Sequence, residues 1–239
     1  MTDAAARTRA PTLHHNRLAD VGLRDEELID VDNVTMLHQD ALRNKNHFDD
    51  TLLETVRAEL ALDSGRQFKL VANLPYSVAT PIISNLLLTD DVPVAMIVTI
   101  QKELADRMLA PPSTKDYSAL SVWIQSQCRV ELIRTMPPEA FWPRPLVTSA
   151  IIRLTIDPAL RARIHDLPYF HEFVRSMFFH RRKFLRSVVI SAFKDRLDKP
   201  AVDEVLLTLG HGPTARAEEL TVEQMIALGD ALRAKVENL

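Results

Sequence analysis

Four consecutive residues at positions 73–76, Asn-Leu-Pro-Tyr, combine groups that could hold a flat aromatic amine for reaction. The exocyclic amine of a base such as adenine is a poor nucleophile, and it must move toward tetrahedral geometry before it can attack a methyl group. The amide oxygen of Asn73 and the carbonyl of Leu74 can accept its two N–H bonds and hold that geometry. No strong base is required, because the nitrogen becomes acidic only after the transfer, so catalysis would be mostly positioning.

The next two residues support the same interpretation. Pro75 stiffens the turn that presents the Leu74 carbonyl, and Tyr76 offers a ring on which the base can stack. Taken alone, the four residues also fit a tight turn with a tyrosine in the core. An isolated motif of this length is more often such a structural turn than a binding site.

The elements around this motif indicate a layered sheet. Residues 68–72 form an apolar run that is typical of a buried parallel strand, and ligands of open α/β sheets bind at the carboxyl ends of strands. Helical spacing is seen at residues 46–62, and Thr80 with Pro81 has the pattern of an N-cap and first helical position. Further strands are predicted at residues 34–38, 94–100, 129–136 and 149–156, and further helices at 102–109 and 118–127. This alternation predicts an α/β fold.

The carboxyl-terminal third has a different pattern. From residue 168 to 239 the apolar spacing is helical throughout, with a boundary near residues 157–167, so a small all-α domain is expected there. Residues 161–199 carry ten Lys and Arg against four acids, a formal charge of +6, while the rest of the chain carries −9. This segregation suits a polyanionic partner, although a solvated helix face would have the same composition.

Composition excludes several classes of protein. With 46% hydrophobic and 26% charged residues among 239, the chain is neither disordered nor collagen-like. The single cysteine, Cys128, cannot form an intrachain disulfide and suits a reducing, cytoplasmic compartment. No apolar run is long enough to span a bilayer, and no metal site is predicted. Only five glycines are present, which at first argues against a nucleotide cofactor held in a glycine-rich loop.

The chain resembles the ribosomal RNA adenine N6,N6-dimethyltransferases, above all those that modify bacterial small-subunit rRNA. The resemblance runs from about Asn33 to the carboxyl terminus. It rests on six blocks in order: NVTMLHQDAL (33–42), LVANLPYSVATP (70–81), IQKELADRMLAPPSTKDYSALSV (100–122), AFWPRPLVTSAIIRL (140–154), FFHRRKFLRSVV (178–189) and RAEELTVEQM (216–225).

The resemblance implies a cofactor, S-adenosyl-L-methionine, and a role for several residues. Asp40, at a strand end, and in part Asn73 would hold the cofactor, Asp40 by accepting a hydrogen bond from its adenine amine. Phe141, in a proline-rich loop, would stack the target adenine opposite Tyr76. If the resemblance is set aside, the more common interpretation of Asp40 is a helix N-cap, and that of Phe141 is a loop residue anchored in the core.

RNA binding is expected from the basic run. Arg181, Arg182, Lys183 and Arg186 are expected on about two turns of helix, where they would bind phosphates without reading sequence. Each could instead belong to a solvated helix end. Lys102 is a further candidate for RNA contact, whereas its neighbour Glu103 is expected to start a helix and pair with nearby residues.

The chain departs from the family pattern at three places. Tyr117-Ser118-Ala119 stands where a glycine is common, and Leu146 stands where a lysine usually precedes the valine of the proline loop. Residues 1–32 show neither the glycine-rich loop nor the ribose-binding acid of the family. We therefore expect an atypical, poorly ordered segment at 1–32, and a chain written without its first segment, so that the amino-terminal strands of the sheet are missing.

The expected organisation is thus a partial Rossmann-like methyltransferase domain at 33–157 and a helical RNA-binding domain at 168–239. The resemblance implies S-adenosylmethionine-dependent dimethylation of two adjacent adenosines near the 3′ end of small-subunit rRNA. Immature small subunits would be the partner of a monomeric, cytoplasmic protein. Two alternatives stay open: a ribosome-assembly or RNA-binding remnant without activity, and a methyltransferase of large-subunit rRNA.

Overall fold

The structure is a computed structural model that describes residues 12–14 and 34–238. It divides into two compact units, residues 1–68 and 69–239, which are described separately. The expected boundary at 157–167 thus stays a prediction within the second unit.

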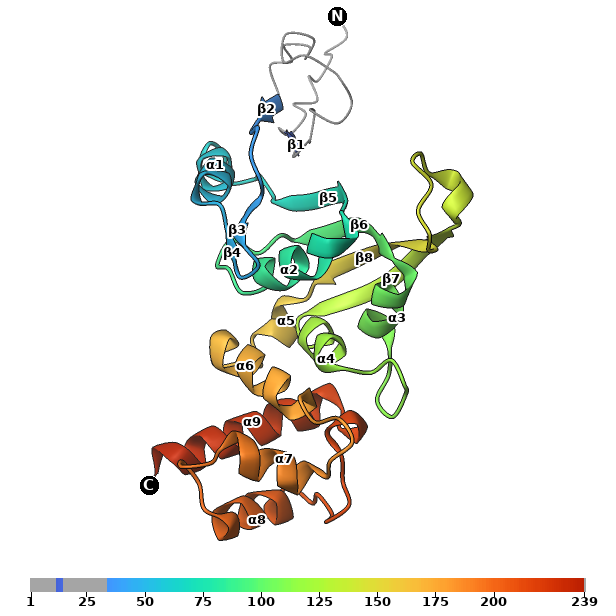
Figure 1. Ribbon diagram of the computed structural model, residues 1–239. Helices are drawn as coiled ribbons and strands as arrows, with labels where there is room; N and C mark the ends of the chain where they lie inside the picture. The colour runs from blue at the N-terminus through green and yellow to red at the C-terminus, as the bar shows by residue number, and fades with distance from the viewer. Residues whose placement is uncertain (1–11, 15–33, 239) are drawn as a thin grey trace, which may run out of the picture. The chain divides into compact units, whose positions relative to one another are not determined.

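Within its described residues, 12–14 and 34–68, the first unit contains short strands and one helix (Figure 1). Strand β1 (Thr12–His14) pairs in parallel with β2 (Val34–Met36), and β3 (Leu42–Asn44) forms a hairpin with β4 (His47–Phe48). Helix α1 (Asp50–Ala61) follows, and the Asp49 carboxylate caps it by accepting from the Thr51 N–H at 2.9 Å. The sequence analysis expected no regular structure at residues 12–14 and missed the hairpin. The weak helix expected at 17–30 lies outside the described residues.

The second unit is built on a four-stranded mixed sheet. Its order is β5 (Lys69–Asn73), β6 (Ala95–Gln101), β8 (Ser149–Ile156) and β7 (Cys128–Met136). Strands β5 and β6 are parallel, whereas β8 is antiparallel to both of its neighbours. Consequently the carboxyl ends of β5, β6 and β7 and the beginning of β8 all lie at one end of the sheet.

One face of this sheet forms the core. The side chains of Met96, Val98, Ile100, Ile152 and Leu154 on β6 and β8 are all fully buried. Helices α2 (Tyr76–Leu86), α3 (Lys102–Leu109) and α4 (Ala119–Gln125) lie over that face (Figure 1).

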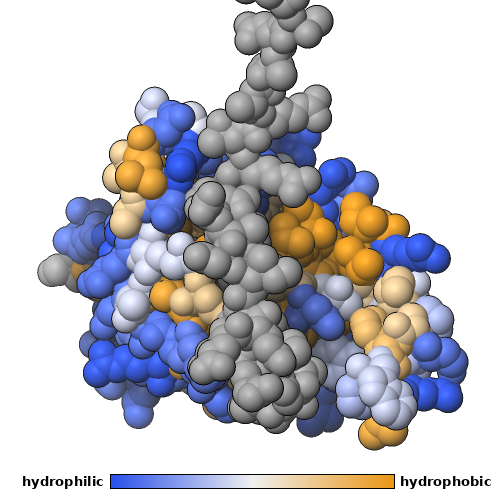
Figure 2. All heavy atoms as spheres, turned by 90° about the horizontal axis from the view of Figure 1, so that it is seen from above, coloured by the Kyte–Doolittle hydropathy of each residue, from blue (hydrophilic) through white to orange (hydrophobic). Residues whose placement is uncertain are grey.

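The opposite face of the sheet is much more open. Val71 is 72% exposed, so the prediction that 68–72 is a buried strand is wrong. The reason is that β5 ends the sheet and its side chains alternate between the two faces. Figure 2 shows hydrophobic side chains reaching the surface beside hydrophilic ones.

Helix α2 begins five residues earlier than expected. Pro75, not Thr80, precedes its first residue, and Pro81 lies inside the helix. The carbonyl of Pro75 accepts hydrogen bonds from the N–H groups of Val78 and Ala79, both at 3.1 Å, and this starts the helix immediately after the turn.

The part after residue 157 is helical, as predicted, and no strand occurs in its described residues up to 238. It contains α5 (Pro158–Arg161), α6 (Leu167–Phe178), α7 (Leu185–Ala192), α8 (Lys199–Thr208), the 3-10 helix η4 (Ala217–Glu219) and α9 (Val222–Glu237). Asp157, Asp166, Asp198 and Thr221 each accept a backbone N–H as the N-cap of α5, α6, α8 and α9. The beginnings of these four helices are therefore set by local capping signals, whereas α7 has no side-chain cap.

One half-buried histidine is expected to make the stability of the protein depend on pH. His171 on α6 lies 4.7 Å from the Trp123 ring, its Nε2 is 3.3 Å from the Ser84 hydroxyl, and burial followed by the charge of Arg175 lowers its pKa. With a lowered pKa in the folded state, the unfolded chain takes up the proton first as the pH falls. This contribution to stability is therefore complete above about pH 6.5 and is lost progressively below it.

We expect the urea midpoint of the wild-type protein to fall between pH 7 and pH 5. The urea midpoint of the His171→Gln variant should fall less over the same pH range, since the glutamine side chain does not titrate. Burial also lowers the pKa of His211, so His211→Gln serves as the comparison variant. An undiminished fall in His171→Gln would contradict the assignment to His171.

Candidate active site

The end of the sheet brings together three segments that are distant in sequence. The N–H of Leu74, after β5, donates to the Thr99 carbonyl of β6 at 3.2 Å. The N–H of Lys102, after β6, donates to the Thr148 carbonyl at 2.9 Å, directly before β8. The turn at 73–76, the beginning of α3 and the end of the loop before β8 are thus joined by backbone hydrogen bonds.

Asn73 and Leu74 present two acceptor groups at this place. The Asn73 side chain is exposed, and in the described part of the chain its amide has no hydrogen-bond partner. The Leu74 side chain is 6% exposed and anchors the turn in the core. Its carbonyl accepts no hydrogen bond from the residues that the structure describes. Neither oxygen is therefore engaged in a hydrogen bond with the described residues.

Tyr76 is held in place by a serine that the sequence analysis did not single out. The Tyr76 hydroxyl and the Oγ of Ser149 lie 2.6 Å apart in a hydrogen bond, and Ser149 is fully buried at the beginning of β8. The ring is only half-buried. Ser149 belongs to the block at 140–154, but nothing in its spacing shows that it pairs with a residue 73 positions earlier.

Phe141 lies in the loop that joins β7 to β8, residues 137–148, which projects beyond the end of the sheet (Figure 1). The 3-10 helix η3 (Pro138–Ala140) directly precedes Phe141. The N–H of Phe141 donates to the Pro138 carbonyl at 3.3 Å. Its side chain is half-buried. This loop ends at Ser149, so Phe141 belongs to the same end of the sheet as Tyr76.

Asp40 lies in the first unit and is exposed. Strand β2 ends at Met36, so Asp40 follows the strand by four residues and does not stand at its end. The expected position was wrong because the strand at 34–38 is shorter than its apolar pattern indicates. The role of Asp40 toward a cofactor stays a prediction.

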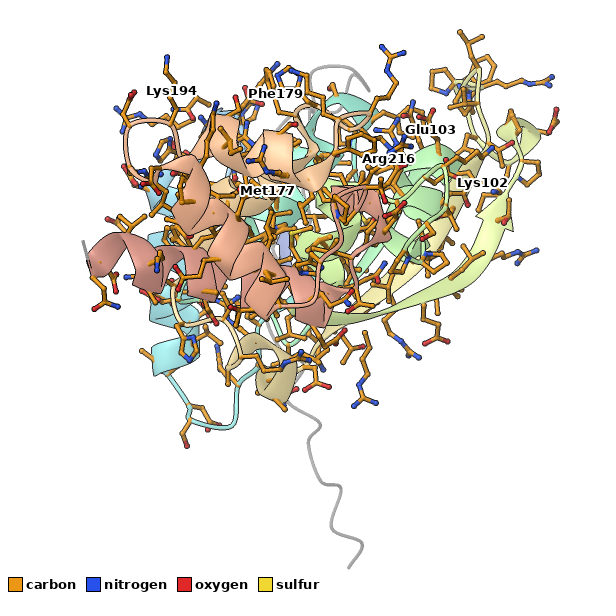
Figure 3. The ribbon with its side chains drawn as sticks, turned by 90° about the horizontal axis from the view of Figure 1, so that it is seen from below. Lys102, Glu103, Met177, Phe179, Lys194 and Arg216 are labelled. Atoms are coloured by element: carbon orange, nitrogen blue, oxygen red, sulfur yellow. The ribbon has the colours of Figure 1, made fainter. Side chains whose placement is uncertain are left out.

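Lys102 and Glu103 begin α3 and lie next to each other in Figure 3. The Lys102 ammonium donates to both carboxylate oxygens of Asp106, at 2.8 and 2.7 Å, and Glu103 pairs with Arg107. The local pairing expected for Glu103 is therefore found. Lys102 has the same kind of pairing, although its side chain is 44% exposed.

The basic run forms a turn between α6 and α7 and not two turns of helix, since α6 ends at Phe178 and α7 begins at Leu185. Its four cations differ sharply. The Arg181 guanidinium donates to Glu218 at 2.5 Å and to the carbonyls of Lys115 and Thr114.

Arg186 makes two hydrogen bonds to Asp203, at 2.5 and 2.8 Å, which raise its pKa. Arg182 and Lys183 are exposed, and no ion-pair partner for them occurs in the described part of the chain. The charge excess of 161–199 is thus partly neutralised by acids from later in the sequence.

Two classes of feature are absent from the described residues. No helix there has the length and apolar character needed to cross a membrane. No group of three or more His, Cys, Asp or Glu side chains is arranged to hold a metal ion in the same residues.

The antiparallel strand β8 lies between β6 and β7, and helices cover the sheet; this arrangement agrees with the Rossmann-like methyltransferase fold of the solved structures given below. The fold prediction is therefore confirmed. The chain belongs to the ribosomal RNA adenine dimethylase family, whose family model matches residues 21–229.

Curated relatives and solved structures agree with this family. The chain is 40% identical over 173 residues to the ribosomal RNA small subunit methyltransferase A of Halothermothrix orenii, covering 72% of this chain and 58% of the relative. It is also 40% identical to that of Lactiplantibacillus plantarum, covering 87% and 68%. The chain thus spans 58% of the first relative's length and 68% of the second's.

Two solved structures share the fold at 20% identity. A dimethyladenosine transferase from Plasmodium falciparum gives a TM-score of 0.70 and covers 86% of this chain and 74% of that one. The 23S rRNA methyltransferase ErmE gives a TM-score of 0.55, and the match covers 92% of this chain and 80% of that one.

Proposed function

We propose that this protein is an S-adenosylmethionine-dependent rRNA methyltransferase that dimethylates the N6 amines of two adjacent adenosines near the 3′ end of small-subunit rRNA. The observation that carries the proposal is the pair of unpartnered acceptors, the Asn73 amide oxygen and the Leu74 carbonyl, beside the fixed Tyr76 ring. Relatives of 40% identity are named for methylation of the small subunit, which favours that substrate.

The residues available for the cofactor have suitable chemistry. Asp40 supplies an exposed carboxylate that can accept a hydrogen bond from an adenine amine, and Asn73 supplies an exposed amide. S-adenosylmethionine, when bound, supplies an electrophilic methyl group on sulfur. On this chemistry we propose each of them, taken separately within its own unit, as a residue that contacts the cofactor.

The chain's own contribution is to hold the adenine N6. The Asn73 oxygen and the Leu74 carbonyl accept its two N–H bonds and draw the nitrogen lone pair out of conjugation with the ring. So held, N6 would be placed to receive the methyl group that the cofactor would supply, and it would then lose one proton to solvent. The bond from the Leu74 N–H to the Thr99 carbonyl fixes the peptide group before Leu74, and Pro75 restricts the backbone that follows the Leu74 carbonyl.

Tyr76 and Phe141 would hold the flipped base by its faces. The Tyr76–Ser149 hydrogen bond fixes the tyrosine ring, so that stacking costs little further ordering. Lys102 could contact RNA only by exchanging its bond to Asp106, so we assign it a minor part.

We further propose that the cations of the basic run differ in their contribution to RNA binding. Arg182 and Lys183 are the two cations of that run with no acid beside them in the described residues, so we assign phosphate contacts chiefly to them. Arg186 and Arg181 would contribute less, because Asp203 and Glu218 neutralise them.

Replacing both Arg182 and Lys183 by alanine should weaken binding of small-subunit rRNA about tenfold or more and lower the slope of log K against log salt by about two. Fluorescence anisotropy across a salt series measures both. The comparison variant is Arg181→Ala, which should lower the melting temperature because Arg181 joins Glu218 to two carbonyls. Equal salt slopes for the double variant and the wild type would contradict the assignment of phosphate contacts to Arg182 and Lys183.

The function is tested by two measurements on the chain. Calorimetry should detect binding of S-adenosylmethionine, and labelled methyl groups should appear as N6-dimethyladenosine at two adjacent positions when unmethylated small subunits are supplied. RNA binding without cofactor binding would show a non-catalytic assembly protein. Methylation confined to large-subunit rRNA would replace the proposed substrate.

The same proposal covers partner and location. Small-subunit rRNA, within the immature small subunit, is the expected partner of a monomeric protein in the cytoplasm. The buried Cys128 thiol, whose pKa burial raises to about 12, needs no oxidising compartment.

A further inference from the structure

The loop at 137–148 exposes hydrophobic side chains to an unusual degree. Trp142 is 95% exposed and Leu146 is 100% exposed, while Val147 is 43% exposed. In the described part of the chain no aromatic ring stacks on Trp142. A tryptophan held almost entirely in water, beside a fully exposed leucine, indicates a surface that meets a partner.

This loop is stiff. It contains four prolines, at positions 137, 138, 143 and 145, and proline fixes one backbone dihedral at each position. The N–H of Ala140 donates to the Pro137 carbonyl at 3.0 Å, and Glu139 pairs with Arg144 across the loop. Trp142 is therefore presented on a backbone that has already lost much of its freedom, which favours binding.

The position of the loop relates it to the candidate active site. Trp142 directly follows Phe141, the residue proposed to stack the target base. The loop is attached to the end of the sheet by the hydrogen bond from the Lys102 N–H to the Thr148 carbonyl. Groups that bind Trp142 and Phe141 would therefore meet the same short loop.

We propose that Trp142, supported by Leu146, stacks on an unpaired nucleotide adjacent to the adenosine that is methylated. This inference rests on the proposed function and names the part of the substrate that the loop contacts. A nucleotide is favoured because removal of one base from a stack leaves its neighbour with an uncovered face. Stacking on an aromatic side chain tolerates any base.

Charge around the loop agrees with base stacking rather than phosphate binding. Glu139 and Arg144 neutralise each other, so that the loop carries no net formal charge. Arg134, near the end of β7, is exposed and has no ion-pair partner among the described residues. It could meet the backbone of the same strand of RNA while Trp142 meets the base.

Intrinsic fluorescence tests the proposal directly, because the chain has two tryptophans and the other, Trp123, is 2% exposed. A hairpin RNA of the small-subunit 3′ end should quench the exposed tryptophan and protect it from iodide. Trp142→Phe should abolish the RNA-dependent change while it keeps most of the affinity. Trp142→Ala should weaken RNA binding about 5- to 100-fold and leave S-adenosylmethionine binding unchanged.

The matched control is Leu207→Ala on α8, where an 80% exposed apolar side chain is removed elsewhere. It should alter neither RNA affinity nor fluorescence. Binding of the hairpin with unaltered Trp142 emission and equal affinity in Trp142→Ala would overturn the stacking role and leave the proposed function standing. If the wild-type chain neither binds nor methylates the RNA, both proposals fail.

Discussion

Asn73→Ala is expected to reduce methyl transfer by about 100- to 1000-fold with RNA binding unchanged. The substitution removes an oxygen that would hold the target amine in tetrahedral geometry, and the Leu74 carbonyl alone cannot orient both N–H bonds. Because the Asn73 side chain is exposed and has no partner among the described residues, the melting temperature should stay at the wild-type value. Single-turnover methylation of unmethylated small subunits measures the effect.

Asn73→Asp provides the matched control, since it keeps an acceptor oxygen at the same position. It should retain more activity than the alanine variant. Near-wild-type turnover in Asn73→Ala would remove Asn73 from the reaction. A large loss of thermal stability in that variant would mean that its role is structural.

Tyr117→Ala is expected to lower the free energy of unfolding by about 3–5 kcal/mol. Tyr117 is fully buried, and its hydroxyl donates to the Leu220 carbonyl at 2.8 Å. Its ring packs edge to face on Phe178, with centroids 6.0 Å apart. The residue therefore joins the loop after α3 to the helices that follow the sheet. Urea unfolding measures the loss.

Tyr117→Phe separates the contribution of the hydroxyl hydrogen bond from that of the ring packing. It keeps the ring contact and leaves the Leu220 carbonyl without its donor, which should cost about 1–2 kcal/mol. Equal stabilities of the alanine and phenylalanine variants would show that ring packing contributes little. The position is of interest because Tyr117 belongs to the segment 117–119, where the family that the sequence resembles commonly has a glycine.

Local signals were sufficient for most elements of the second unit. The strand at 149–156 and the helix at 102–109 have the bounds expected from their apolar spacing. The helical character of 168–238 was also visible in sequence, because the helices carry their own N-caps. Prediction was weaker at residues 12–14, 42–48 and 76–79, where very short strands and a proline-initiated helix have little periodicity.

The candidate site was identified in sequence mainly through its motifs. The turn at 73–76 and the loop containing Phe141 lie at the same end of the sheet, as the resemblance implied. Ser149 was missed, because a hydroxyl that orients Tyr76 from the neighbouring part of the sheet has no local signature.

What the sequence determined by itself was the family, the alternation of strands and helices, and the residue types able to hold an adenine amine. Only the tertiary structure decided which of these groups are available for binding. It pairs Arg181 with Glu218 and Arg186 with Asp203, and it leaves Arg182, Lys183 and Trp142 exposed. The physical reason is that an acid distant in sequence can neutralise a cation once the chain folds, whereas composition counts every charge as though it faced solvent.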